Sequence, residues 1–186
     1  SKAARDSAGI LDASTLGKID IQGSDASEFL NRVYTNAWSK LSIGKCRYGL
    51  MLNEDGMVYD DGVTTRLDEN HYIMTTTTGG AANVMGKLED YLQTEWPELE
   101  VYLTSVTDHF ATVSICGPNS KKILNKVISD LDLSDENFPH MSFKNAQIGK
   151  IKCRVMRISF TGEHTYEINM QANYGKSVWE KCMEAG

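Results

Sequence analysis

The chain has 186 residues, of which 41% are hydrophobic and 24% charged, with a net charge of −6 and a pI near 5.2. This composition is ordinary for a soluble globular protein with room for one large domain or two small ones. The acidic balance argues against a nucleic-acid binder or a polybasic membrane binder, and no apolar run approaches the length of a membrane-spanning helix.

Four cysteines stand far apart, with no Cys-x-x-Cys pair and no histidines at ligand spacing. They indicate small buried side chains in a reducing compartment, and the first residues show no signal-peptide pattern. We therefore expect a cytoplasmic protein without a metal site. The chain opens on Ser1 and stops inside an expected helix, so we also expect a fragment of a longer protein.

Two stretches of the chain, residues 18–33 and 112–127, align without a gap at an offset of 94 residues. Five identities within so short a stretch indicate an internal duplication. The identical pairs are Ile21 and Ile115, Gly23 and Gly117, Leu30 and Leu124, Asn31 and Asn125, and Val33 and Val127.

Both copies predict the same order of elements: a strand, a helix, three strands and a second helix. Hairpins between helices indicate an α+β fold with antiparallel sheets, and we place the two units at 1–104 and 105–186. The strands are expected at about 16–22, 46–52, 57–66 and 71–76, and again at about 110–116, 141–148, 151–159 and 165–170. The helices are expected after Gly23 and Gly117, and over about 80–93 and 173–185.

Two adjacent acids, Asp60 and Asp61, interrupt the strand expected at 57–66. Strands disfavour Asp, and adjacent residues of a strand point to opposite faces, so one acid should point into the protein. At the offset of 94, Asp61 corresponds to Val155 and Asp60 to Arg154. Without a bulge, Asp61 is then the acid on the apolar face and Asp60 faces solvent. The alternative is that both are strand-end or turn acids.

Other polar stretches have two readings each. The threonines and glycines of 73–83 would line a polar pocket with a helix N-terminus aimed at an anion, or simply lead a strand into a helix. Glu163 and Glu167 flank a turn, where surface charge is the default. Tyr48, Trp38 and Phe160 form either a stacking wall or part of the core. No dinucleotide or phosphate-loop fingerprint occurs.

Three of these stretches resemble one known family. "GKCRYGLMLNEDGMVYDDGV" resembles the signature G-K-x-x-Y…M-L-N-x-x-G-G-x-x-D-D-L of the glycine-cleavage T-protein (aminomethyltransferase) family, with the Tyr to Asp-Asp spacing preserved. "ICGPNSKKIL" resembles the family's Q-G-P-x-A turn, and "SFTGEHTYEI" its T-G-Y-T-G-E hairpin. Gly62 departs from the usual Leu after the acids. The resemblance covers nearly the whole chain.

The resemblance implies a T-protein-like folate-binding fold, here without the family's C-terminal β-barrel. It implies that Asp61 contacts an amine nitrogen of tetrahydrofolate, orients it and takes its proton as it attacks an imine. By the same correspondence Tyr48 packs against the folate, Thr76 bonds near the pterin and Glu167 accepts hydrogen bonds from the pterin. Phe160 stands where the hairpin of the family usually has Tyr, so a hydroxyl contact with the folate is lost and only stacking on it remains.

Within the family, "YGLMLNEDGMVYDDGV", "TTTTGGAA" and "TEWPELEVYLTSVTDH" most resemble the branch formed by the α subunits of heterotetrameric sarcosine oxidase. That branch implies capture of the one-carbon unit of oxidised sarcosine as methylene-tetrahydrofolate, with flavin and NAD bound elsewhere in the α subunit or on the other subunits. The isolated chain would then not oxidise sarcosine.

Three alternatives remain open. The first is a T-protein-like aminomethyltransferase or a folate-dependent demethylase with no flavin partner. The second is a non-catalytic folate-binding module, although the K-G-C-Y-x-G-Q motif of such a relative does not occur here. The third is a purely structural scaffold, which gives no reason for an inward-pointing acid.

Overall fold

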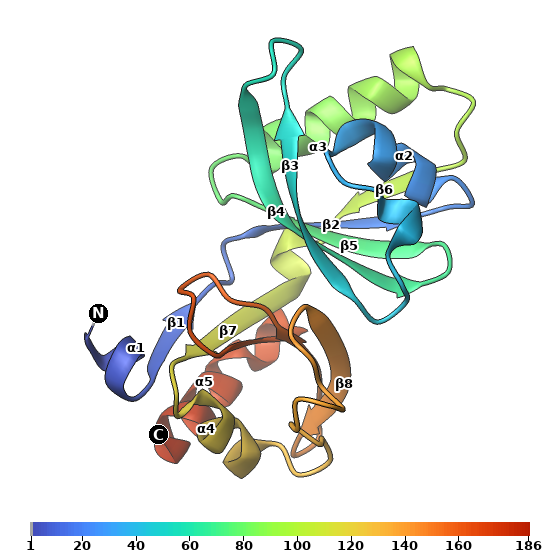
Figure 1. The fold of residues 1–186 in the computed structure, drawn as a ribbon. Helices are drawn as coiled ribbons and strands as arrows, with labels where there is room; N and C mark the ends of the chain where they lie inside the picture. Colours follow the sequence, from blue (N-terminus) through green and yellow to red (C-terminus); the bar gives the residue numbers. More distant parts are fainter. Residues whose placement is uncertain (1) are drawn as a thin grey trace. The chain divides into compact units, whose positions relative to one another are not determined.

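The computed structural model describes residues 2–186. They form two five-stranded antiparallel sheets, and two helices cover one face of each sheet (Figure 1). Each sheet belongs to a compact unit of its own. One unit is formed by residues Thr15–Thr107, and the other by the segment ending at Ser14 together with Asp108–Gly186. We refer to them as the 15–107 unit and the 108–186 unit.

The 15–107 unit has the strand order β3-β4-β5-β2-β6. Apolar residues of helices α2 and α3, among them Phe29, Leu30 and Leu88, are fully buried against Ile21 and Met74 of the sheet. The strands are β2 (Gly17–Gln22), β3 (Cys46–Leu52), β4 (Val58–Asp68), β5 (His71–Thr76) and β6 (Tyr102–Ser105). The helices are α2 (Ala26–Val33) and α3 (Ala81–Asp90), with short helical turns at Trp38–Lys40 and Tyr91–Glu95. A further turn, Thr107–His109, lies where the chain passes from this unit to the other.

The 108–186 unit has the strand order β1-β7-β10-β9-β8. Leu124 of α4 and Val178 of α5 are fully buried against Val155, Ile168 and other apolar residues of the sheet. The strands are β1 (Gly9–Asp12), β7 (Phe110–Cys116), β8 (Ser142–Ile148), β9 (Ile151–Arg157) and β10 (Thr165–Gln171). The helices are α1 (Lys2–Asp6), α4 (Ser120–Val127) and α5 (Gly175–Ala185), the last preceded by the turn Ala172–Tyr174.

Every strand and helix expected from the sequence is present, so the predicted α+β fold with antiparallel sheets is confirmed. The fifth strand of each sheet was not predicted. β1 and β6 have four residues each, and at this length an alternating pattern is hardly visible. β1 pairs with β7, which groups the N-terminal segment with the 108–186 unit, although the sequence analysis placed it in a unit ending at residue 104.

The internal duplication is present in the strand registers. Ile21 of β2 lies opposite Tyr72 of β5, and Ile115 of β7 lies opposite Tyr166 of β10, at the expected offset of 94 (115 − 21 and 166 − 72). The next strand behaves differently. Thr64 of β4 lies opposite Met74 of β5. Ile168 of β10, the residue equivalent to Met74, lies opposite Val155 of β9. Thr64 therefore corresponds to Val155, at an offset of 91 (155 − 64).

This three-residue shift follows from the longer connection between β9 and β10 than between β4 and β5. An odd shift moves every side chain of a strand to the opposite face. The comparison of β4 with β9 at an offset of 94 therefore assigns the residues of β4 to the wrong faces.

None of the four cysteines forms a disulfide and all four are buried, as the composition indicated. Burial raises the pKa of the Cys153 thiol to about 12 and that of Cys182 to about 11.

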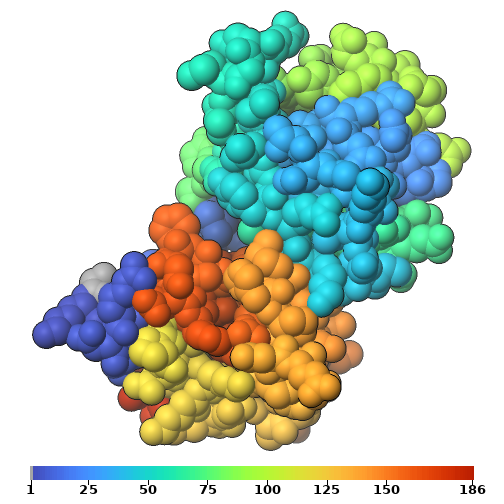
Figure 2. Space-filling view, viewed as in Figure 1, coloured from blue at the N-terminus to red at the C-terminus, as the bar shows by residue number. Residues whose placement is uncertain are grey.

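Among residues 2–186, no helix is long and apolar enough to cross a membrane. The hairpin between β3 and β4 projects from the 15–107 unit and exposes Met57 and Val58 at its tip (Figure 2).

Candidate functional site

The Asp-Asp pair is divided between the two faces of β4, in the opposite sense to the one predicted. Asp60 is only 5% exposed and Asp61 is partly exposed. The register of β4 explains this: Asp60 lies opposite Met51 and Thr64 opposite Arg47 without interruption, so Asp60 shares the core side of the sheet with the buried Thr64. A β-bulge at Tyr59 lies beyond Asp60, toward the hairpin turn, and does not set its face. The prediction was wrong because it took the faces of β4 from the comparison with β9 at an offset of 94.

Asp61 lies on the face of β4 that carries Tyr48 of the adjacent strand β3. The Tyr48 hydroxyl donates a hydrogen bond of 2.8 Å to Oδ2 of Asp61. Among the described residues, Oδ1 of Asp61 has no hydrogen-bond partner. Tyr48 is 50% exposed, so the pair offers a free carboxylate oxygen beside an accessible aromatic ring.

The hydrogen bond to Asp61 raises the pKa of the Tyr48 phenol, with smaller contributions from burial and from the negative charge of Asp61. Because the pKa in the folded protein lies above the unfolded value of about 10, the bond is complete below that pH and is lost as the pH rises through the raised pKa.

We expect the Asp61→Asn variant to bring the Tyr48 pKa back toward about 10, because the charged acceptor is removed. NMR titration of tyrosines labelled with ¹³C at Cζ measures this pKa, and the Tyr48→Phe variant assigns the signal. Asp55→Asn, a change in the exposed hairpin loop, is the control and leaves the Tyr48 pKa in place. An unchanged pKa in Asp61→Asn would contradict the bond.

Asp60 binds the segment that leads into α3. Its Oδ1 accepts a hydrogen bond of 2.6 Å from the Thr77 hydroxyl, and its Oδ2 accepts one of 3.2 Å from the Thr77 backbone N–H. The Thr77 hydroxyl oxygen in turn accepts from the N–H of Gly80, the residue before α3. Asp60 thus holds the segment before this helix N-terminus, and the Gly80 N–H reaches the carboxylate only through the Thr77 hydroxyl.

Side chains also connect β4 to the end of β5. The Val63 N–H donates to the Thr75 hydroxyl oxygen over 3.0 Å, and this hydroxyl lies 3.2 Å from the Val63 carbonyl oxygen, to which it donates. Gly62 permits this approach, because a Cβ there would lie 1.9 Å from the Thr75 carbonyl oxygen. Thr76 is 2% exposed and donates its hydroxyl proton to the Thr77 carbonyl.

The other two residues named from the sequence lie in the 108–186 unit. Glu167 is 9% exposed in β10, between Ser114 of β7 and Met156 of β9. Phe160 is 94% exposed in the connection between β9 and β10. Glu163 forms a 2.5 Å ion pair with Arg5, so the two glutamates have different surroundings.

The structure therefore brings Tyr48 and Asp61 together and holds Thr76 in a fixed segment of the same unit. Trp38, which the sequence left between stacking wall and core, is fully buried in the core. Asp60 was misjudged and Thr77 was missed. No local signal reveals their contact, since they are 17 residues apart and belong to different strands and turns.

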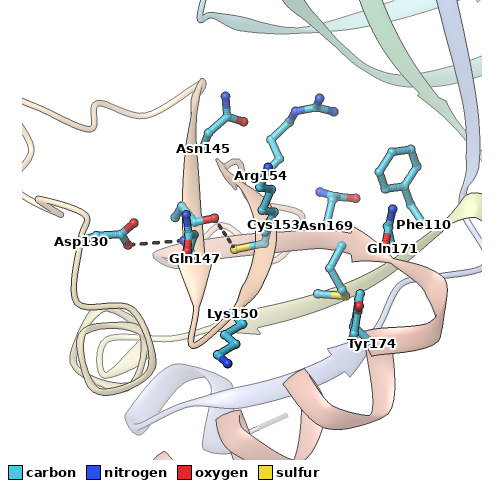
Figure 3. Close-up of a pocket in the computed structure, with 13 residues that line it drawn as sticks. Phe110, Asp130, Asn145, Gln147, Lys150, Cys153, Arg154, Asn169, Gln171 and Tyr174 are labelled. Carbon is cyan, nitrogen blue, oxygen red and sulfur yellow. Dashed lines mark hydrogen bonds between the residues drawn. The ribbon is translucent and has the colours of Figure 1, made fainter.

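The 108–186 unit also holds an open depression of about 590 Å³ where β9 and β10 separate (Figure 3). Polar residues predominate in its lining, and the sequence analysis singled out none of them as site residues. The lining residues are Phe110, Asp130, Asn145, Ala146, Gln147, Lys150, Lys152, Cys153, Arg154, Asn169, Met170, Gln171 and Tyr174.

Comparison with known proteins assigns the fold to a family. The family model described as "GCVT N-terminal domain" matches residues 1–186, the whole chain. The chain belongs to the GCVT N-terminal domain family. The predicted kinship with the glycine-cleavage T-protein is thereby confirmed.

Two relatives and one solved structure show where this GCVT domain stands. It is 54% identical over 186 residues to the sarcosine oxidase subunit alpha of Corynebacterium sp. (strain U-96), covering 100% of this chain and 19% of that subunit. It is 34% identical over 186 residues to the aminomethyltransferase of Thermoanaerobacter sp. (strain X514), covering 100% of this chain and 49% of that enzyme.

The crystal structure of glycine cleavage system aminomethyltransferase T from Bartonella henselae superposes on the GCVT domain with a TM-score of 0.84 at 25% identity. The match covers 98% of this chain and 47% of that one, and it confirms the T-protein-like fold. The chain spans about a fifth of the sarcosine oxidase subunit and about half of the aminomethyltransferases that it matches.

Proposed function

We propose that this GCVT domain is the tetrahydrofolate-binding region of a sarcosine oxidase α subunit. In this proposal it accepts the one-carbon unit of oxidised sarcosine to give methylene-tetrahydrofolate. The 54% identity to a sarcosine oxidase α subunit, against 34% to an aminomethyltransferase, supports this branch of the family. Flavin and NAD would bind other parts of the full enzyme, and its other subunits would be the protein partners.

The observation that carries the proposal is the Tyr48–Asp61 pair. A carboxylate with one oxygen fixed by a phenol and the other available can accept the N–H of an aryl amine and hold it in one orientation. Tetrahydrofolate supplies such an amine nitrogen. Asp61 would orient it and take its proton, and the half-exposed Tyr48 ring would pack against the ligand.

The remaining proposed residues differ in how they would contribute. The ring of Phe160 is exposed enough to stack on a ligand, and Glu167 would accept hydrogen bonds from the pterin. Thr76 is nearly inaccessible, so its contribution would be to hold the segment between β5 and α3 in place. The free buried thiols fit a reducing compartment, and we propose a cytoplasmic location.

Calorimetric titration of the purified protein with tetrahydrofolate tests the proposal. We expect saturable binding that Asp61→Asn weakens about tenfold or more, because a hydrogen bond to a charged group contributes about 1.5–3 kcal/mol. Asp55→Asn is the matched control, since it removes the same charge from the exposed β3–β4 loop. Equal affinity in both variants would refute the role of Asp61, and absence of binding to the full protein would refute folate binding.

A second candidate is an aminomethyltransferase without a flavin partner, which the TM-score of 0.84 to such an enzyme favours. The purified full protein distinguishes the two. Oxygen consumption that depends on sarcosine supports the oxidase. Transfer of an aminomethyl group to tetrahydrofolate without oxygen uptake supports the transferase.

A further inference from the structure

The depression of the 108–186 unit lies where its sheet opens. β9 and β10 pair only between the positions Met156–Glu167 and Cys153–Met170. Beyond Met170, β10 continues along β7 alone, where Gln171 lies opposite Phe110. The divergence of β9 from β10 leaves a space of about 590 Å³, within the usual size range of small-molecule sites.

A row of polar side chains crosses four strands at this end of the sheet. Asn145 of β8 lies opposite Arg154 of β9, which lies opposite Asn169 of β10, which lies opposite Thr112 of β7. Their neighbours along the strands, such as Ile168 and Val113, belong to the core beneath the helices. The row therefore lies on the other face of the sheet.

Asn169 is the member of this row that points to a ligand. It is 8% exposed, and its Oδ1 accepts a hydrogen bond of 2.7 Å from the Thr112 hydroxyl, which fixes the amide. Its Nδ2 is buried without a hydrogen-bond partner among the described residues, although Asn169 lines the depression. An unsatisfied buried donor is destabilising, and a ligand acceptor would satisfy it.

The neighbouring groups define the charge of that acceptor. Figure 3 shows the polar ends of Asn145 and Arg154 directed to the same side of the sheet, with Asn169 near them and the Phe110 ring beyond. The guanidinium of Arg154 lies 5.6 Å from the centre of the Phe143 ring, which supports its plane. The one acid of the lining, Asp130, accepts a 3.4 Å hydrogen bond from the Gln147 N–H.

A guanidinium fork and amide N–H donors form the usual surroundings of a carboxylate. We propose that this depression binds a small carboxylate anion with a flat apolar body, through Arg154, Asn145 and Nδ2 of Asn169. The Phe110 ring forms the apolar wall of the site. The proposed site uses neither Tyr48 nor Asp61, and Glu167, which precedes Asn169 by two residues on β10, is not part of its lining.

Titration of the purified protein with benzoate, followed by calorimetry, tests the site. We expect saturable binding that Asn169→Asp weakens at least tenfold, since this change keeps the acceptor for Thr112 and replaces the donor Nδ2 with a negative oxygen. Lys144→Gln is the matched control. It alters the net charge by the same amount, lies on β8 outside the lining, and is expected to leave affinity unchanged.

Arg154→Gln provides a second variant in case Asn169→Asp unfolds, and we expect it also to weaken benzoate binding at least tenfold. The side-chain amide signal of Asn169 in ¹⁵N-labelled protein should shift on saturation with benzoate. Asp61→Asn should leave benzoate binding intact. No saturable binding, or equal affinity in the Asn169, Arg154 and Lys144 variants, would overturn the proposal, as would tighter binding of inorganic phosphate than of benzoate.

Discussion

Replacing Asp60 with alanine is expected to lower the free energy of unfolding by about 3 kcal/mol. The change removes two hydrogen bonds that Thr77 donates to a charged acceptor whose side chain is only 5% exposed. It also removes the negative charge at the N-terminus of α3. Relief of the desolvation of a buried carboxylate offsets part of the loss.

Urea unfolding followed by circular dichroism measures this effect of Asp60→Ala. Glu54→Ala serves as the control because it removes an acid from the exposed β3–β4 loop, and we expect it to change stability by less than about 0.5 kcal/mol. The Asp60→Asn variant keeps one acceptor oxygen and should fall between the two. A loss of under about 1 kcal/mol in Asp60→Ala would show that the carboxylate does not hold the segment.

The second large effect is expected from Gly62→Ala, which should destabilise the protein by about 2–3 kcal/mol. The added Cβ would lie 1.9 Å from the Thr75 carbonyl oxygen and 2.8 Å from its carbon, and backbone atoms move less readily than side chains. The displacement would also break the exchange of hydrogen bonds between Thr75 and Val63. Since Asp61 precedes Gly62, we expect weaker tetrahydrofolate binding as well.

Gly86→Ala is the matched control for this substitution. Gly86 lies exposed in α3 and no atom lies within 4 Å of the position that its Cβ would take. A helical glycine replaced by alanine should stabilise the protein by roughly 0.5–1 kcal/mol, so the two changes are expected to differ in sign. Equal unfolding free energies for the two variants would contradict the close approach of Thr75 to β4.

Local sequence patterns predicted the strands and helices well because most of them are long enough to show their period. Alternation of apolar residues is visible in β9, and the glycines and turn residues mark the hairpins. The pairing of Tyr48 with Asp61 was also within reach of the sequence, through the family motif, because both lie in one β-hairpin.

The faces of β4 were not predictable in the same way. The longer β9–β10 connection shifts β9 against β4 by three residues, so the faces of the two strands do not correspond at the offset of 94, and neither composition nor periodicity reveals this shift. The contact between Asp60 and Thr77 and the row from Asn145 to Thr112 depend on strand registers, which the hydrophobic pattern does not set for polar side chains.

The pairing of β1 with β7 separates the order of synthesis from the order of assembly. During synthesis, Gly9 emerges from the ribosome before its partner Cys116, which follows 107 residues later (116 − 9). At about 5–20 residues per second, β1 waits on the order of 5–20 s for its neighbour. During that interval the strands β2 to β6 are already available to complete their own sheet. The nascent chain thus carries an unpaired strand in front of a domain able to fold, a substrate for chaperones or for premature pairing between neighbouring chains.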